Sequence, residues 1–291
     1  MLRCVKCHND LIKLNSEYFC NTCKRSYPSK NGIFVFLTDA YDENFFPEET
    51  FNELYNLEAA NFWFKVRNLI VGNFIQKYAS NNSKIVEFGC GTGFVSSYLR
   101  TLGYDLDCAD MSIQGLNYCK SRGSGSNYYQ FNLYDPLFYD HYDCICAFDV
   151  IEHVNDDLLV LRNFNSALKS GGIIFITVPA NKKLWSGTDE LANHKRRYDA
   201  TELEEKLGLE GFRIVRISYF MTFLYPVLFI KRMWVNQVSG KGKVKTSNEL
   251  KINRLLNGLF YHIFKLESHL LNYVNLPFGS SLICVAQKRR D

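Results

Sequence analysis

The glycine-rich turn Gly89-Cys90-Gly91-Thr92-Gly93 is the segment whose residue types and spacing most clearly suggest chemistry. An apolar, strand-like run precedes it, and a helical pattern follows it. Glycines at this spacing let the backbone turn sharply and approach a ligand more closely than a Cβ atom would allow. Asp110 ends the next strand-like run, at the distance where a carboxylate holds the ribose hydroxyls of a nucleotide-type ligand. The pattern therefore predicts a site for an adenosine-containing cofactor.

The spacing of the glycines narrows the class of cofactor. Dinucleotide sites use Gly-x-Gly-x-x-Gly with a pyrophosphate at the helix end, whereas this turn is Gly-x-Gly-x-Gly and follows Glu87. A carboxylate beside the turn would repel a pyrophosphate, but it suits a sulfonium and an amino-acid ammonium group. Asn132, after the third expected strand, offers an amide that can hydrogen-bond to an adenine edge. The pattern favours a cationic adenosyl cofactor.

Two histidines and a polar loop are the candidates for catalysis. His153 follows the fourth expected strand, and His194 shares a loop with Asp189, Arg197 and Tyr198. This loop follows the fifth strand, so it lies at the carboxyl edge of the sheet, where ligands bind in such folds. An imidazole titrates near neutral pH and can remove the proton of an oxygen acceptor. The alternatives are a helix cap or core hydrogen bond for the first histidine and a solvated basic turn for the loop.

Four cysteines near the start of the chain have the spacing of a metal site. Cys4 with Cys7, and Cys20 with Cys23, form two Cys-x2-Cys pairs. Two such pairs place four thiolates around one tetrahedral ion, the arrangement that zinc prefers in structural sites. A segment of about forty residues cannot bury a sufficient core without such support. Because four thiolates leave no position for water, the zinc is expected to be structural and not catalytic.

These residues need a framework, and the apolar pattern supplies one. Strands are expected near 84–88, 104–109, 127–131, 142–148, 172–178, 212–218 and 280–287, and helices near 65–78, 93–102, 112–121, 156–169 and 200–208. The alternation predicts an α/β fold with a Rossmann-like seven-stranded sheet covered by helices on both faces. The expected organisation is a zinc ribbon at 1–40, a linker and edge helix at 41–64, and a main domain at 65–291 with a helical insertion at 219–279.

Four motifs occur in an order that resembles a known family. They are the glycine turn with Glu87, the acid Asp110, the segment 149–154 (DVIEHV) and the segment 168–172 (LKSGG). Together they resemble class I methyltransferases that use S-adenosylmethionine (SAM), nearest the ubiquinone-biosynthesis-type and type 11 branch. The resemblance covers roughly residues 60–220. It implies the seven-stranded SAM methyltransferase fold, with SAM as the cofactor.

The resemblance also implies roles for individual residues. Gly89, Cys90, Gly91 and Gly93 would line the methionine part of SAM, Asp110 and Met111 would hold ribose and adenine, Asn132 and Leu133 the adenine edge, and Phe148 and Asp149 the floor near the sulfonium. This chain has Asn132 where the family usually has Asp. Residues 3–37 resemble the small zinc-ribbon family that activates tRNA and translation-factor methyltransferases, and also the ribbon that leads a family of rRNA guanine methyltransferases.

The charge of the chain is unevenly distributed. The net charge is +4, but residues 220–291 contain eleven basic and three acidic residues. Within the insertion, apolar segments at 219–235 and 250–275 flank a lysine-rich loop, and both read as amphipathic helices. Such a pair would pack as a cap on the body, lie on a membrane surface or form a dimer interface. A basic region of this kind suggests an anionic partner.

The leading hypothesis is a SAM-dependent methyltransferase that acts on an oxygen, or less favourably a nitrogen, of a small or lipid-linked metabolite such as a sugar. The first alternative is an RNA methyltransferase whose ribbon and basic tail bind RNA. The second is a non-enzymatic zinc-ribbon activator or scaffold. The absence of a signal sequence and the ten cysteines suggest the cytoplasm, with peripheral membrane contact through 219–275 as an added expectation.

Overall fold

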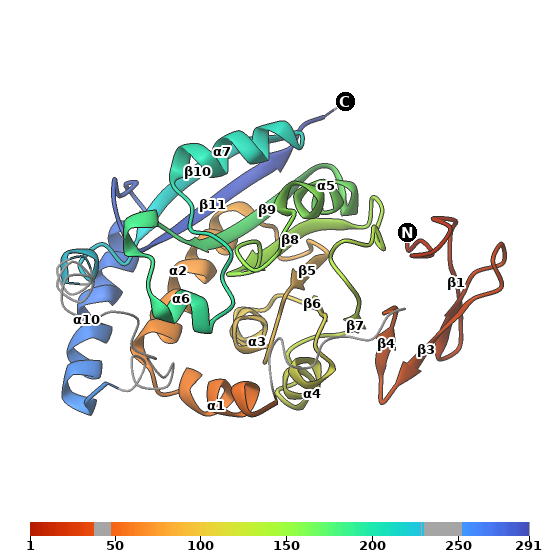
Figure 1. Ribbon diagram of the computed structural model, residues 1–291, viewed down its shortest axis with the longest axis horizontal. Coiled ribbons are helices and arrows are strands. Elements are labelled where there is room, and N and C mark those ends of the chain that lie inside the picture. The colour runs from red at the N-terminus through yellow and green to blue at the C-terminus, as the bar shows by residue number, and fades with distance from the viewer. Residues whose placement is uncertain (38–47, 228, 230–251, 291) are drawn as a thin grey trace.

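One continuous sheet organises the protein. The computed structural model describes residues 1–37, 48–227, 229 and 252–290. Its strands follow the order β1-β2-β3-β4-β7-β6-β5-β8-β9-β11-β10 (Figure 1). The last seven strands of this order form the expected Rossmann-like α/β sheet, and the first four come from the N-terminal ribbon. The expected seven-stranded fold is confirmed, and the ribbon extends its sheet to eleven strands.

The seven strands of the main sheet lie where the apolar runs predict them. Their bounds are β5 Ile85–Phe88, β6 Leu106–Asp110, β7 Tyr128–Gln130, β8 Tyr142–Phe148, β9 Leu168–Pro179, β10 Phe212–Phe220 and β11 Ser281–Lys288. The strands from β5 to β9 pair in parallel, while β11 pairs antiparallel with both β9 and β10. β9 begins at Leu168, earlier than the predicted 172, because α5 leads directly into the strand.

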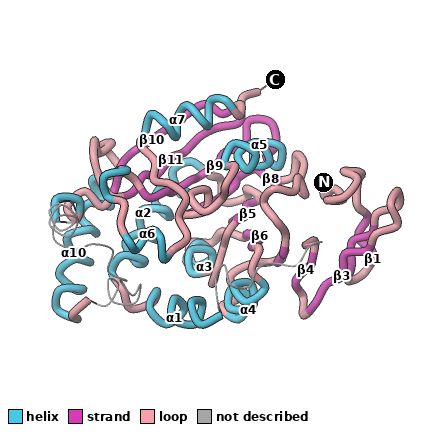
Figure 2. Tube along the Cα trace, viewed as in Figure 1, coloured by secondary structure: helices cyan, strands magenta, loops and turns pink. Residues whose placement is uncertain are grey.

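Helices cover both faces of this sheet (Figure 2). Their bounds are α1 Glu48–Glu58, α2 Phe62–Tyr78, α3 Phe94–Thr101, α4 Ile113–Ser121, α5 Asp157–Ala167, α6 Gly187–Leu191, α7 Ala200–Leu209 and α10 Arg254–Leu270, with a 3-10 turn at Lys182–Leu184. Successive strand residues point to opposite faces. Ile145 therefore packs in the core under α5 and α7, whereas Cys144 and Cys146 pack in the core under α2 and α3. None of the described helices is long and apolar enough to cross a membrane.

Polar caps fix several of the helix starts. The side chain of Asn61 accepts a hydrogen bond from the backbone N–H of Trp63 and so begins α2 at Phe62, three residues before the predicted 65. Ser112, Asp156 and Asp199 cap α4, α5 and α7 in the same way. These caps set the positions at which the chain leaves each strand and turns back along the sheet.

The ribbon, residues 1–37, joins the main sheet directly. Its strands are β1 Ile12–Leu14, β2 Glu17–Phe19, β3 Ser26–Lys30 and β4 Ile33–Val35. β4 pairs in parallel with β7, and the backbone N–H of Phe36 donates to the carbonyl of Gln130 at 2.8 Å. Phe34 stacks on Tyr129, with ring centroids 5.8 Å apart. The ribbon therefore lies at one end of the molecule as an extension of the sheet (Figure 1).

The insertion before the last strand contains α10, which confirms the second expected helix. This helix packs against α2: Phe264 stacks on Phe62 at 5.5 Å between ring centroids. Asn257 accepts a hydrogen bond from the backbone N–H of Phe62 and donates one to the carbonyl of Ala60. The first expected helix, at 219–235, begins while β10 still runs to Phe220. Most of the rest of it, and the lysine-rich loop, lie outside the described residues.

A buried histidine makes the stability of this fold depend on pH. Burial, with the nearby charge of Lys84, lowers the pKa of His141 to about 3. In an unfolded chain a histidine titrates near pH ~6.5. Between these values the unfolded state binds a proton that the folded state does not. Stability from this site is therefore lost as the pH falls from about 6.5 toward about 3.

This linkage predicts the behaviour of a non-titrating variant. His141→Gln should lose less of its unfolding temperature between pH 7 and pH 5 than the unmodified protein does. Thermal unfolding followed by circular dichroism at both pH values measures this difference. His262→Gln, which removes an exposed histidine of α10, is the matched control and should follow the unmodified protein. An identical pH dependence in His141→Gln would contradict the assignment.

Candidate functional site

The glycine turn after β5 adopts a backbone that only glycine tolerates well. Gly89, Gly91 and Gly93 all have positive φ angles, at 71°, 51° and 74°. A Cβ atom on Gly89 would lie 2.5 Å from a methyl group of Val150, and one on Gly93 would lie 2.6 Å from the Sγ of Cys119. At Gly91 nothing lies within 4 Å of such an atom. Gly89 and Gly93 are thus constrained by packing, whereas Gly91 faces open space.

Asp110, at the end of β6, is tied to this turn. One carboxylate oxygen accepts the backbone N–H of Gly91 at 2.8 Å, and the other accepts that of Ser112 at 2.8 Å. Burial raises the pKa of Asp110, although both backbone bonds act against that rise. The carboxylate thereby links the ends of two neighbouring parallel strands at the edge where ligands bind.

A cleft of about 150 Å³ opens over this edge. It is lined by Phe51, Leu54, Glu58, Phe64, Arg67, Glu87, Gly89, Cys90, Gly91, Thr92, Phe94, Val95, Phe148 and Asp149. Six of the predicted cofactor residues are among them: Glu87, Gly89, Cys90, Gly91, Phe148 and Asp149. The described part of the 41–64 segment forms α1, whose Phe51, Leu54 and Glu58 lie along the cleft. Burial raises the pKa of Glu87 to about 8, and Ser96 donates a hydrogen bond to it.

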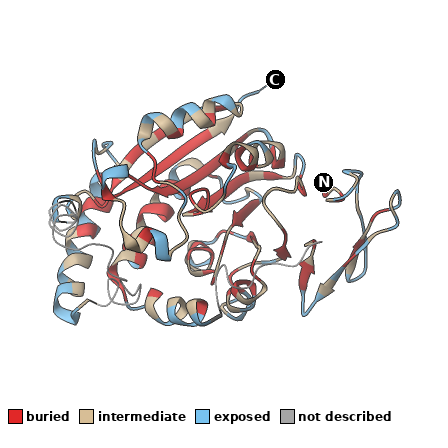
Figure 3. Cartoon of the chain, in the orientation of Figure 1, coloured by how far each residue is buried: buried red, intermediate tan, exposed pale blue. Residues whose placement is uncertain are grey.

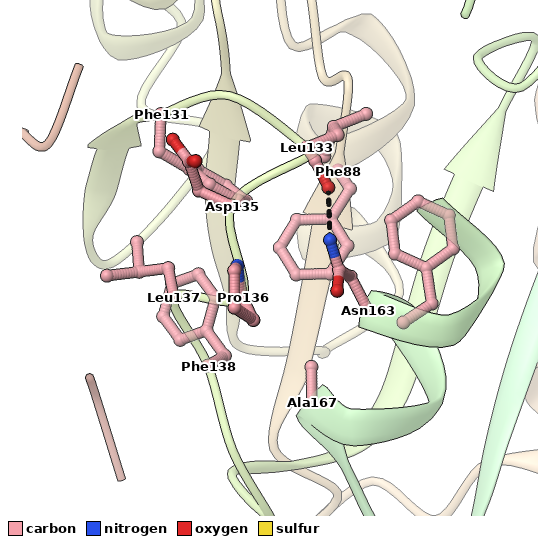
Figure 4. Close-up of a pocket in the computed structure, with 10 residues that line it drawn as sticks. Phe88, Phe131, Leu133, Asp135, Pro136, Leu137, Phe138, Asn163 and Ala167 are labelled. Carbon is pink, nitrogen blue, oxygen red and sulfur yellow. Dashed lines mark hydrogen bonds between the residues drawn. The ribbon is translucent and has the colours of Figure 1, made fainter. Parts of the chain in front are cut away.

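The residues predicted for adenine lie beside the cleft and do not line it. The carbonyl of Met111 accepts a hydrogen bond from Gln130 at 3.0 Å, and Asn132 accepts one from the backbone of Tyr134 at 3.1 Å. Leu133 lines a separate cavity, where its carbonyl accepts a bond from Asn163 at 2.9 Å (Figure 4). That cavity measures about 10 Å³, which is room for about one water molecule. Contacts of Met111, Asn132 and Leu133 with the cofactor remain predictions.

Two charged residues of the cleft escaped the sequence analysis. Arg67, in α2, forms an ion pair with Asp149, and its guanidinium lies 4.9 Å from the ring centroid of Trp63. Glu58, in α1, accepts the hydroxyl of Thr92 at 2.7 Å and pairs with Arg122 at 2.8 Å. The spacing of Trp63 and Arg67 places them one turn apart on a helix, which was the available signal. Nothing local showed that this turn faces the cleft.

The structure brings three of the five predicted catalytic residues together. The Nδ1 atom of His194 lies 2.9 Å from a carboxylate oxygen of Asp189. The rings of His153 and His194 meet edge to face, with centroids 4.8 Å apart. The Nε2 atoms of both histidines lie 4.0 Å from the same oxygen of Glu152. Glu152 follows Asp149 of the cleft within one turn, so this group adjoins the predicted cofactor site.

Burial sets the charges of this histidine group. Burial alone would raise the pKa of Asp189, but the bond from His194 and the charge of Arg197 outweigh it and lower the pKa to about 2. Burial, with the neighbouring His194, lowers the pKa of His153 to about 4, so this ring is neutral at pH 7. Burial and the charge of Asp149 raise the pKa of Glu152 well above its usual range. The group therefore holds one ionised carboxylate, directly behind His194.

Arg197 and Tyr198 have supporting positions. Arg197 is buried; its Nε donates to Asp189 at 2.7 Å, and its terminal nitrogen donates to the carbonyl of Ala180 at 3.0 Å. The buried hydroxyl of Tyr198 donates to Asp157 at 2.7 Å. The loop after β9 is therefore held against the body, and the alternative of a freely solvated basic turn is wrong for these residues. Their own roles in catalysis remain predictions.

The four cysteines of the ribbon meet at one point. The Sγ atoms of Cys4 and Cys23 are 3.5 Å apart, those of Cys7 and Cys20 are 3.4 Å apart, and all four lie within 4.8 Å of one another. A tetrahedral site with Zn–S bonds of about 2.3 Å has sulfur atoms about 3.8 Å apart, so these residues fit a zinc ion. Two other groups in the described part have ligand atoms equally close: Cys90 with Cys108 and Cys119, and Glu152 with His153 and His194.

The sequence matches known proteins over the region that builds the cleft. A family model described as methyltransferase domain matches residues 56–217. A protein of Mycolicibacterium smegmatis, described as a probable S-adenosylmethionine-dependent methyltransferase, is 26% identical over 165 residues, which cover 54% of this chain and 62% of that protein. A ubiquinone biosynthesis O-methyltransferase of Proteus mirabilis is 27% identical over 122 residues, which cover 39% of this chain and 50% of that enzyme. The chain thus matches little more than half the length of these relatives.

Solved structures share the fold at low sequence identity. One is a chain from the complex between the Haloferax volcanii Trm112 methyltransferase activator and a methyltransferase, with a TM-score of 0.57, 14% identity, and coverage of 87% of this chain and 100% of that chain. Another is phosphoethanolamine N-methyltransferase 2 of Haemonchus contortus in complex with S-adenosyl-L-methionine, with a TM-score of 0.57, 15% identity, and coverage of 92% and 62%. These likenesses show a shared architecture.

Proposed function

Because the chain belongs to the methyltransferase domain family, we propose that it transfers a methyl group from SAM to an oxygen of a small or lipid-linked metabolite, such as a sugar. Nitrogen is a less favoured acceptor. The observation that carries this proposal is the position of the Asp189–His194 pair beside the cleft of the glycine turn. An oxygen acceptor must lose a proton during methylation, and an oriented imidazole can accept it.

The cleft offers a partner for each part of SAM. The cofactor supplies an electrophilic methyl group on a sulfonium. The glycine turn would hold its methionine part, Asp110 would accept hydrogen bonds from the ribose hydroxyls, and Arg67 would pair with its carboxylate. Asp149, which is paired with Arg67 in the structure, is the nearest carboxylate for the ammonium group. Glu87, whose raised pKa keeps it largely protonated at pH 7, would contribute a hydrogen bond.

In this proposal His194 is the general base. The carboxylate of Asp189 accepts the Nδ1 proton, which leaves Nε2 free to take the proton of the acceptor hydroxyl. Arg197 holds Asp189 in place and helps to keep it ionised. Holding the acceptor in line with the methyl group supplies the remaining rate enhancement, which reaches roughly 7–11 kcal/mol in well-oriented reactions.

The cofactor assignment makes a direct prediction for Asp110. Asp110→Ala should weaken SAM binding by about tenfold or more, because two charge-assisted hydrogen bonds of roughly 1.5–3 kcal/mol each are lost. Isothermal titration calorimetry measures this affinity. Asp105→Ala, which removes an exposed carboxylate just before the same strand, is the matched control and should bind SAM normally. Unchanged affinity in Asp110→Ala would remove the assignment.

We also propose that Cys4, Cys7, Cys20 and Cys23 hold one structural zinc ion. The ribbon then acts within the same chain as a support for the sheet edge, because β4 pairs with β7 and Phe36 bonds to Gln130. Gln130 in turn bonds to the carbonyl of Met111, next to Asp110. The solved complex of a methyltransferase with a separate activator is consistent with such a supporting role.

A labelling experiment tests the acceptor class. The protein is incubated with SAM that carries a labelled methyl group and with fractionated cell extract, and the label is followed into lipid, sugar and RNA pools. Label in lipid or sugar supports the proposal. Label in RNA, with binding that weakens steeply as salt rises, would favour the RNA alternative instead. A protein that takes up no SAM would be the scaffold of the second alternative.

A further inference from the structure

Helix α10 presents apolar residues on two opposite sides. One side packs on α2 through the buried Phe264. The other carries Leu255, Leu259, Leu266 and Leu270, which recur at helical spacing and form what we name the leucine face. These four side chains are 83%, 54%, 70% and 44% exposed. Four leucines in one exposed stripe are unusual on a surface, and such patches mark sites of interaction.

The charges around the leucine face indicate what it meets. The structure describes every residue of α10, and the only acid among them, Glu267, is buried and accepts the backbone N–H of Thr222. The other charged side chains of the helix, Arg254 and Lys265, are exposed and basic. A second copy of the chain would bring these like charges together. An anionic surface complements them.

We propose that the leucine face seats α10 on the surface of an anionic lipid bilayer, with the helix lying in the plane of the interface. Amphipathic helices of this kind bury an apolar stripe among the upper acyl chains while basic side chains contact the headgroups. The leucines supply the apolar stripe, and Arg254 and Lys265 supply the basic contacts. Figure 1 places α10 at the end of the molecule opposite the ribbon, and Figure 3 shows exposed residues along the helix.

This seating brings the cleft close to the membrane. α2, on which α10 packs, carries Phe64 and Arg67, which line the cleft. Only this helix therefore separates α10 from the edge of the cleft, and an α-helix is about 10 Å across. The arrangement suits an acceptor that is anchored in lipid, and this part of the inference rests on the proposed function. The seating itself does not depend on any methyl transfer.

Vesicle sedimentation without SAM or acceptor tests the seating. The full chain is mixed with vesicles of phosphatidylglycerol and phosphatidylcholine in equal parts, and separately with vesicles of phosphatidylcholine alone. We expect sedimentation with the anionic vesicles, weakened by added salt. The triple variant Leu255→Ser/Leu259→Ser/Leu266→Ser should bind them about tenfold or more weakly, because three apolar side chains no longer enter the bilayer. Leu209→Ser, which removes a 73% exposed leucine of α7, is the matched control and should bind normally.

Companion measurements separate the other outcomes. SAM affinity and unfolding temperature should be the same in the triple variant and the unmodified protein. If the triple variant unfolds at a clearly lower temperature, the leucines are covered by the chain itself and the proposal fails. If light scattering shows a dimer that the triple variant dissociates, a second copy is the occupant. Absence of sedimentation with anionic vesicles, or equal sedimentation of the triple variant, also overturns it.

Discussion

Replacing His194 with alanine is expected to lower the rate of methyl transfer by about 10²- to 10⁴-fold, the usual contribution of a positioned general base. The reason is the geometry around its ring: Asp189 accepts the Nδ1 proton at 2.9 Å, which leaves Nε2 to receive the proton of the acceptor. Asp189→Asn should lower the rate in the same direction, because an amide stabilises the wrong tautomer. Single-turnover measurements with saturating SAM and the identified acceptor give the rate of the chemical step.

Two further measurements separate catalysis from structure. SAM affinity should stay within about twofold of the normal value in both variants, because neither residue lies in the lining of the cleft. The rate of His194→Ala should also lose the rise with pH that reports the ionisation of a base. His262→Ala, which removes an exposed histidine of α10, is the control and should be fully active. A His194→Ala variant with a normal rate and pH profile would rule out this base.

Replacing Cys7 and Cys20 together with serine is expected to abolish zinc binding and to unfold the ribbon. Structural zinc sites contribute roughly 10–16 kcal/mol of apparent binding energy, far more than a segment of this size gains from its own core. Metal analysis should find one zinc ion per chain in the unmodified protein and none in the variant. Limited proteolysis should then cut within the first 37 residues of the variant only.

The consequence for the main domain can be measured on the same samples. The unfolding temperature should fall, because the aromatic contacts of Phe34 and Phe36 with Tyr129 are lost together with the ribbon. Cys284→Ser, a change at a buried thiol of β11, serves as the cysteine control and should retain zinc. If the unmodified protein contains no metal while its ribbon still resists protease, the four thiols have another role.

Local patterns in the sequence were sufficient for the elements that surround the cleft. The strand that ends at Phe88 is apolar because helices cover both of its faces, and the glycines after it are required by positive φ angles and by close packing. Cysteine spacing was sufficient to bring Cys4 and Cys23 together, because each knuckle is a local turn. The loop carrying Asp189 was predictable as part of the site because it follows a parallel strand at its carboxyl end.

Contacts between distant segments were not predictable in this way. Nothing near Arg67 shows that α2 lies beside the glycine turn, so its ion pair with Asp149 appears only in the folded chain. Hydrophobic periodicity likewise identified α10 as amphipathic but did not show which of its two apolar sides would be buried. The start of β9 at Leu168 was missed because a Gly-Gly pair normally signals a loop, whereas here Gly171 adopts a positive φ within a strand.

The parallel pairing of β4 with β7 has a practical consequence for work on shortened forms. A protein trimmed to begin at α1 would leave the backbone groups of β7 open along one border of the sheet. Exposed borders of this kind recruit strands from other molecules and lead to aggregation. Such a fragment would therefore be expected to precipitate at concentrations that the full chain tolerates, even with every residue of the cleft intact.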